Sequence, residues 1–194
     1  MSTASLLGSL LLASILFNSF AQEIKPDNYV FIGEAIHIED IIPEKNSIQL
    51  NYGVRVTYKV IKNLSRNFSK DTIEIEAYFH CGARLFTRNK HVLLAAIPEG
   101  NKFYLLRSHY LDVYKTTDKK WASPGVPLKF NPFGKSSLKP YPLKFVDSVW
   151  YDIRQPDNGC MKKVNFPEPY FKTEGNKAIA LMGLYVEDIY PLKK

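Results

Sequence analysis

Two stretches near the middle of the chain alternate strictly between apolar and polar residues. In GVRVTYKVIK (residues 53–62), three valines and Tyr58 share one face, and DTIEIEAYF (residues 71–79) repeats the pattern with isoleucines. A period of two is typical of a β-strand with one buried face. The pattern therefore predicts two amphipathic strands, joined by the polar segment NLSRNFSKD (residues 63–71).

Further strand-like segments flank this pair. The segment YVFIGEAIHI (residues 29–38) contains Gly33, and a glycine inside a strand commonly marks a bulge or a tight bend. KHVLLAAIP (residues 90–98) and KFYLLRSHY (residues 102–110) flank the short turn EGN and predict a hairpin. About five strands over residues 29–110, without a convincing helix, are typical of a small barrel or sandwich.

The pattern is weaker in the second half of the chain. Residues 115–144 hold five prolines and two glycines, which exclude a central strand or a long helix and predict an ordered loop. FVDSVWYDI (residues 145–153) predicts a further strand. NKAIALMGLYVEDIY (residues 176–190) is compatible with a buried strand or with a short helix.

The N-terminus has the layout of a secretory signal. A polar start is followed by an apolar run from Leu6 to Phe17 and by small residues at Ser19 and Ala21, which predicts cleavage after Ala21. The run is shorter than the about 20 apolar residues of a membrane-spanning helix. The first residues lack the usual Lys or Arg, so an uncleaved anchor or an ordinary buried helix is the alternative. We expect a secreted or periplasmic protein without a transmembrane segment in its mature chain.

The length of the mature chain limits the number of domains that it can form, and the distribution of its charge distinguishes its two halves. The 173 residues that follow the predicted signal at 1–21 (194 − 21) fit one domain. We expect a single β domain over 22–194, made of a barrel over about 29–110 and an extension over about 111–194. Residues 102–194 carry sixteen Lys and Arg against nine Asp and Glu, which accounts for the whole net charge of +7. The extension is therefore the basic part.

The chain has two cysteines, Cys81 and Cys160. In an oxidising compartment pairing is the default expectation, because a free thiol would be a liability. A disulfide between them would join the end of the third predicted strand to the second half of the chain and stabilise the fold by about 4 to 5 kcal/mol in the chain-entropy model. Gly82 would let the backbone turn sharply after the cysteine.

The stretch around the first cysteine resembles the netrin-type module, whose fold is shared with the tissue inhibitors of metalloproteinases. The resemblance lies in a strand ending at Cys81-Gly82, in Phe86, and in the apolar run VLLAA (residues 92–96) after a turn. YVFIGEAIHI and YKVIKNLSR resemble that family's first two strands, so the resemblance covers about Tyr29 to Ser108. It implies a mainly β fold, a small five-stranded OB-like barrel to which this chain adds a proline-rich, basic C-terminal elaboration.

The chain departs from the inhibitors at its mature N-terminus. In that family a Cys-x-Cys presents its free amine and carbonyl to the protease zinc, whereas this mature chain would begin Gln22-Glu23-Ile24. Without a disulfide to hold the first residue, inhibition of zinc proteases by that mechanism is not expected.

No arrangement of residues predicts catalysis or metal binding. His80 and Cys81 are neighbours on a strand and point to opposite faces, so they cannot form a nucleophile–base pair. His37, His91 and His109 are scattered singly, and none of the common catalytic or metal motifs is present. We predict no catalytic, metal or cofactor-binding residue and no cofactor, and an exported enzyme with an unrecognised site is an alternative.

NLSRNFS holds two N-x-S sequons, at Asn63 and Asn67. They are acceptors for glycosylation in a eukaryotic secretory pathway and have no such meaning in a bacterium.

The segment 115–144 combines seven lysines with aromatic side chains on a proline-stiffened chain. Such a segment can bind an anionic surface or a protein partner; the alternative is a solubilising loop whose aromatic side chains pack back on the barrel. We predict a non-enzymatic binding module with an unknown protein or anionic partner and without nucleic acid; an inhibitor that acts on proteases through a surface loop is a further alternative. The predicted contact residues are Lys115, Lys119, Lys120, Trp121, Lys129, Lys135, Lys139 and Lys144.

Overall fold

The fold is known from a computed structural model of the chain. Among the residues that it describes, no helix is long and apolar enough to cross a membrane. The described residues are 24–25, 27–43, 52–65, 68–79, 89–128, 133–134, 137–154 and 165–191, without the side chains of 107 and 108.

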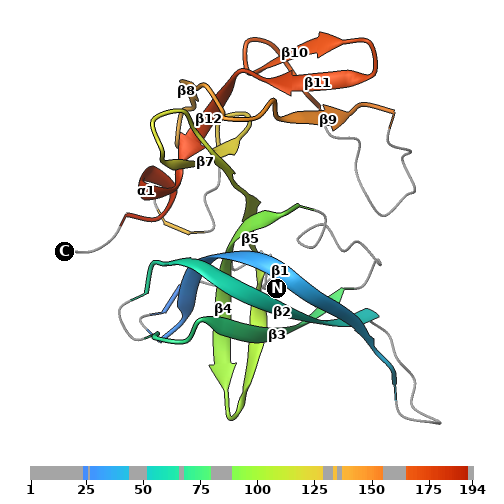
Figure 1. The fold of residues 1–194 in the computed structure, drawn as a ribbon, viewed down its shortest axis with the longest axis vertical. Coiled ribbons are helices and arrows are strands. Elements are labelled where there is room, and N and C mark those ends of the chain that lie inside the picture. Colours follow the sequence, from blue (N-terminus) through green and yellow to red (C-terminus); the bar gives the residue numbers. More distant parts are fainter. Residues whose placement is uncertain are drawn as a thin grey trace, which may run out of the picture.

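Five strands close into a barrel in the order β1-β2-β3-β5-β4 (Figure 1). The β3–β5 pair is parallel, at Glu76 and Tyr104, and the other pairs are antiparallel. This is a five-stranded barrel of the OB type, so the predicted mainly β fold with a small barrel is confirmed. The strands are β1 (Tyr29–Ile41), β2 (Tyr52–Asn63), β3 (Thr72–Phe79), β4 (His91–Glu99) and β5 (Lys102–Asp112).

The alternating residues fill the barrel as their period of two predicts. Val56 and Tyr58 of β2 and Ile75 of β3 are fully buried, and they belong to the hydrophobic cluster of the barrel interior together with Phe31 of β1 and Leu94 of β4. The outward positions between them are left for polar side chains.

The bulge expected at Gly33 is present. The register between β1 and β2 shifts between Ile32 and Gly33. A Cβ at Gly33 would lie 2.8 Å from Phe31 Cε2 and 2.9 Å from Tyr58 Cδ1, so only glycine lets these two buried rings approach the strand.

The extension contains more regular structure than the predicted loop. One sheet has the order β6-β7-β12-β8 and a second the order β10-β11-β9, as Figure 1 shows above the barrel. The expectation that the prolines exclude a central strand was wrong, because β7 lies between β6 and β12 and is short enough to end at Pro124. The strands are β6 (Tyr114–Lys115), β7 (Trp121–Pro124), β8 (Tyr141–Pro142), β9 (Trp150–Asp152), β10 (Phe171–Glu174), β11 (Lys177–Ala180) and β12 (Met182–Tyr185).

Residues 176–190 form both of the structures that their sequence allowed. They contain β11 and β12 and end in the short helix α1 (Val186–Ile189). The further strand predicted over 145–153 is present as β9, which covers only Trp150–Asp152.

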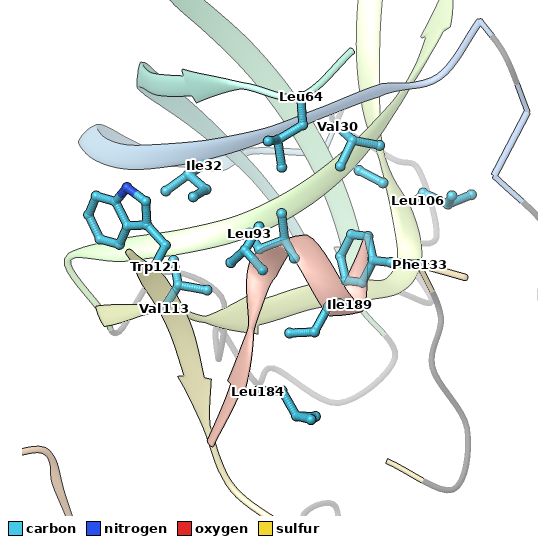
Figure 2. Packing of buried hydrophobic residues seen from close by; sticks show 12 residues of the cluster. Val30, Ile32, Leu64, Leu93, Leu106, Val113, Trp121, Phe133, Leu184 and Ile189 are labelled. Atoms are coloured by element: carbon cyan, nitrogen blue, oxygen red, sulfur yellow. The ribbon is translucent and has the colours of Figure 1, made fainter. Parts of the chain in front are cut away.

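The extension packs on the outside of the barrel through one hydrophobic cluster (Figure 2). Trp121 of β7 and Ile189 of α1 lie in this cluster with Ile32 of β1 and Leu93 of β4. Leu93 alternates with Leu94, which faces the barrel interior. One face of β4 is covered by the barrel interior and the other by the extension, so both faces carry apolar residues.

Candidate functional site

A row of paired residues crosses the barrel over four neighbouring strands. Glu39 of β1 pairs with Arg55 of β2, Arg55 with Glu76 of β3, and Glu76 with Tyr104 of β5. These residues alternate with buried ones such as Val56, so their side chains lie on the outside of the barrel. We call this surface the β2–β3 face; its residues are Glu39, Arg55, Glu74, Glu76, Tyr78, Lys102 and Tyr104.

Arg55 contacts three carboxylates on this face. Its Nη1 donates to Glu39 Oε1 at 2.6 Å and its Nη2 to Glu76 Oε1 at 3.0 Å. Its Nε lies 3.4 Å from Glu74 Oε1. The hydrogen bonds to Glu76 and Glu39 raise the pKa of Arg55, and the hydrogen bond from Arg55 holds the pKa of Glu39 below its usual value.

Glu76 is the buried centre of the face, with a side chain that is 5% exposed. Besides Arg55, Lys102 Nζ donates to Glu76 Oε1 at 3.0 Å and the Tyr78 hydroxyl to Oε2 at 3.0 Å. Burial is the largest single influence on the pKa of Glu76 and raises it, but the hydrogen bonds from Lys102, Arg55 and Tyr78 together outweigh burial and lower the pKa. Glu76 is therefore a hydrogen-bond acceptor at neutral pH and not a proton donor.

A cavity of about 170 Å³ lies beside Glu76, where β3 meets the turn between β4 and β5. Its charged lining consists of two lysines and two glutamates, so the formal charges balance. The residues that line it include Lys70, Glu74, Glu76, Asn101, Lys102 and Phe103.

Two tyrosines adjoin the cavity through Glu76. The Tyr78 side chain is 48% exposed and lies over Gly53, where a Cβ would be 2.9 Å from Tyr78 Cε1. The ring of Tyr104 has its centroid 6.5 Å from that of Tyr78. The face thus presents aromatic rings next to a polar cavity.

A second candidate surface is formed by lysines of the extension. Lys119 and Lys120 lie in the turn between β6 and β7. The backbone N–H of Thr117 donates to the carbonyl oxygen of Lys144 at 2.9 Å, which places Lys144 beside that turn. We call Lys115, Lys119, Lys120 and Lys144 the lysine surface; the predicted contact residue Lys139 is also exposed, in the segment before β8.

Aromatic rings hold two of these lysines in place. Lys115 Nζ lies 4.3 Å from the centroid of the Trp121 ring, and Lys120 Nζ lies 4.5 Å from that of Tyr185. The turn is closed by Thr116, whose hydroxyl accepts a hydrogen bond from the Lys120 backbone N–H at 3.1 Å. The ammonium groups are therefore presented by an ordered turn.

The Trp121 ring lies under Lys115 of the lysine surface and is itself buried. Its side chain is 5% exposed and belongs to the cluster between the extension and the barrel, so its ring is not available to a partner. Phe133, another aromatic residue of the segment, is 3% exposed in the same cluster, whereas Tyr141 is 51% exposed. The packing of Trp121 and Phe133 is what the alternative of a solubilising loop expected.

Two acidic residues lie near the lysines, Asp118 in the turn itself and Glu187 of α1, whose carboxylate interacts with the charge of Lys120. Asp118 Oδ2 is 3.5 Å from Lys120 Nζ and accepts a hydrogen bond from the Tyr185 hydroxyl at 3.1 Å. Glu187 of α1 accepts one from Lys62 at 2.7 Å. The carboxylate of Glu187 belongs to α1, at the C-terminal end of the extension. The composition of residues 115–144 therefore could not reveal it.

Several predictions concern residues outside the described part of the chain. They are the signal peptide with its cut after Ala21, the disulfide between Cys81 and Cys160, contacts of Lys129 and Lys135, and the sequon at Asn67. Asn63 is described, and its side chain is held in place: Oδ1 accepts from the Ser65 backbone N–H at 2.8 Å and Nδ2 donates to the carbonyl oxygen of Phe68. Among the described residues no group of three or more His, Cys, Asp or Glu side chains is placed to hold a metal ion.

Comparison with known proteins gives no match to a family model, to a curated protein or to a solved structure. The barrel by itself does not identify the netrin-type module that the sequence resembles.

Proposed function

We propose that the protein is an exported, non-enzymatic binding module that recognises an anionic partner through the lysine surface. The observation that carries the proposal is the pair of stacked lysines, Lys115 on Trp121 and Lys120 on Tyr185, which flank Lys119 in one closed turn. Export rests on the signal-like sequence over residues 1–21.

The stacking favours binding for an entropic reason. Immobilising a free lysine side chain costs up to about 2 kcal/mol of conformational entropy. A lysine whose ammonium already lies over a ring has lost part of that freedom in the unbound protein. An anionic partner therefore meets charges that are in place before it binds.

The neighbouring acids leave the tip of the turn positive. Asp118 is engaged by Lys120 and by the Tyr185 hydroxyl, and its pKa is held low, first by a hydrogen bond with Thr116. Lys119 and Lys144 are exposed beside it. A polyanion or an anionic membrane surface can contact several of these lysines at once.

The proposal is tested by retention of the mature protein on a heparin column in a rising salt gradient. The double variant Lys119→Gln/Lys120→Gln should elute at clearly lower salt than the unchanged protein, because exposed charges interact through a screened field. The matched control is Lys172→Gln/Lys177→Gln, which removes the same charge from the other sheet of the extension and also removes a stacked lysine, since Lys177 Nζ lies 4.2 Å from the Trp150 ring. Equal elution of the two double variants would show that retention reflects net charge alone and would contradict the proposal.

We also propose that the barrel is a netrin-type module with a disulfide between Cys81 and Cys160. The five-stranded barrel and the Cys81-Gly82 stretch support this assignment. Mass spectrometry of the exported protein after alkylation without reduction tests it: both cysteines should stay unmodified and the chain should begin at Gln22. Alkylation of both thiols would exclude the disulfide.

A further inference from the structure

An exposed valine lies between two lysines of the lysine surface. The backbone N–H of Val146 donates to the carbonyl oxygen of Lys115 at 2.9 Å. This hydrogen bond flanks an antiparallel bridge between Thr116 and Phe145. Residues opposite each other in such a pair share a face, and so do residues two apart along one strand. The side chains of Lys115, Lys144 and Val146 therefore lie on one face, and Val146 is 61% exposed.

An exposed aromatic ring adjoins Lys120 in the same way. Lys120 Nζ lies over the Tyr185 ring, and the centroid of the Tyr141 ring is 6.3 Å from that of Tyr185. Tyr141 belongs to β8, which pairs with β12, and it is 51% exposed. Lysines on both sides of the turn thus have an exposed apolar or aromatic side chain as a neighbour.

These two side chains distinguish between the anionic partners that lysines can bind. A sulfated or phosphorylated polymer offers charge to the lysines but no apolar surface to Val146 and Tyr141. A protein offers both, but lysine is depleted from the core of protein interfaces. A phospholipid membrane offers anionic headgroups beside acyl chains. Surfaces that bind membranes combine lysines with apolar side chains, and tyrosine is enriched at the level of the headgroups.

The charge of the lysine surface complements an anionic membrane. Its four lysines are exposed. The acids nearby are already engaged, Asp118 by Lys120 and Glu187 by Lys62. Each lysine close to an anionic lipid surface strengthens attachment by about fivefold. The lysines therefore supply the attraction that brings the two exposed side chains to the lipid.

We propose that the lysine surface docks on an anionic phospholipid membrane, with its ammonium groups at the lipid phosphates and with Val146 and Tyr141 inserted among the headgroups. The inference rests on the proposed function, because it names the partner of the same lysines. Two side chains bury little apolar area, so the attachment is peripheral and reversible.

The test is co-sedimentation of the mature protein with phosphatidylcholine vesicles that contain either no phosphatidylglycerol or about one third of it. The protein should sediment with the anionic vesicles, stay in solution with the neutral ones, and be released by added salt. Tyr141→Ser/Val146→Ser should bind the anionic vesicles about tenfold more weakly. The same double variant should elute from heparin at the salt concentration of the unchanged protein, because it keeps every lysine.

Two further variants control this comparison. Ile42→Ser/Tyr52→Ser removes an aliphatic and an aromatic side chain, 86% and 70% exposed, from the ends of β1 and β2, and it should match the unchanged protein in both assays. Val146→Ser alone keeps the Tyr141 ring beside Tyr185. It should also weaken vesicle binding, which covers the case in which the loss of Tyr141 displaces Lys120.

The two assays separate this inference from the proposed function. Retention on heparin without binding to anionic vesicles would overturn the membrane as partner and leave the proposed function standing. Failure in both assays would remove both. Vesicle binding that is insensitive to Tyr141→Ser/Val146→Ser and to Val146→Ser would show that charge alone attaches the protein, and it would refute the insertion of the two side chains. Equal binding to neutral and anionic vesicles would contradict the role of the lysines.

Discussion

Arg55 and Glu76 face each other across β2 and β3, and Arg55 Nη2 donates to Glu76 Oε1 at 3.0 Å. From the other side Lys102 of β5 donates to the same carboxylate oxygen, also at 3.0 Å. One glutamate thus ties β2 to β5 across β3, next to the parallel pairing that closes the barrel. The ionised form of Glu76 is the form that makes these contacts.

Glu76→Gln should destabilise the protein by about 1–3 kcal/mol at pH 7, the range for losing hydrogen bonds between charged groups at a buried site. The pKa of Glu76 is lower in the folded protein than its ordinary value, so its ionisation contributes stability above the unfolded-state pKa and that contribution is lost as the pH falls through the folded-state pKa. The difference in unfolding free energy between the unchanged protein and Glu76→Gln should therefore shrink from pH 7 to pH values below about 4. Urea denaturation at several pH values measures it.

Glu174→Gln is the matched control for this experiment. Glu174 also pairs with a lysine, at 2.6 Å from Lys172 Nζ, but both side chains are more than half exposed. Exposed ion pairs contribute little, so this variant should match the unchanged protein at every pH. A constant difference for Glu76→Gln down to acidic pH would show that Glu76 stabilises the barrel without its charge.

Lys119→Gly should stabilise the protein by about 0.5–1 kcal/mol. Lys119 has a φ of 64°, in the left-handed region that glycine adopts without a steric penalty. Lys119→Ala removes the same charge and keeps the Cβ, so it should show no such gain. Thermal or urea unfolding of the two variants separates the conformation from the charge. A Lys119→Gly variant that is no more stable than Lys119→Ala would contradict the prediction, because relief of the left-handed backbone would then not exceed the conformational entropy that glycine adds to the unfolded chain.

The barrel could be predicted because its strands have a period of two and because glycines mark the bulge in β1 and the turn between β4 and β5. The alternation over residues 53–62 and 71–79 put Val56 and Ile75 in the interior, and Gly33 marked the bulge. The extension was harder because its strands have two to four residues, which is too short for a period to show. The arrangement of these short strands depends on packing against β1 and β4, and a local sequence pattern does not reveal that packing.

The candidate site was not predictable for a related reason. Glu39, Arg55, Glu76 and Tyr104 are neighbours only through the strand register, and the register joins residues far apart in the chain. The sequence marked the lysines of the basic segment by composition, but it did not show that Trp121 faces the barrel. The even spacing of the polar residues in β2 and β3 was the only local signal of an outer polar face.

The two tryptophans of the chain test how the extension is held. Both lie under a lysine, Trp121 under Lys115 and Trp150 under Lys177, but Trp121 is 5% exposed and Trp150 is 47% exposed. Trp121→Ala should destabilise the protein by about 3–5 kcal/mol because it empties the cluster between the sheet and the barrel. Trp150→Ala loses an exposed cation–π contact and should cost only about 0.5–1 kcal/mol.

Urea denaturation followed by circular dichroism gives both values, and the remaining tryptophan of each variant reports on the extension by fluorescence. If Trp121→Ala unfolds the extension first, the residual barrel signal should persist to higher urea, because the barrel interior around Tyr58 and Ile75 is a separate cluster. Similar, small losses for both variants would mean that the Trp121 ring does not hold the extension on the barrel. The lysine surface would then lack its rigid support, and Lys115 would not be held in place before a partner binds.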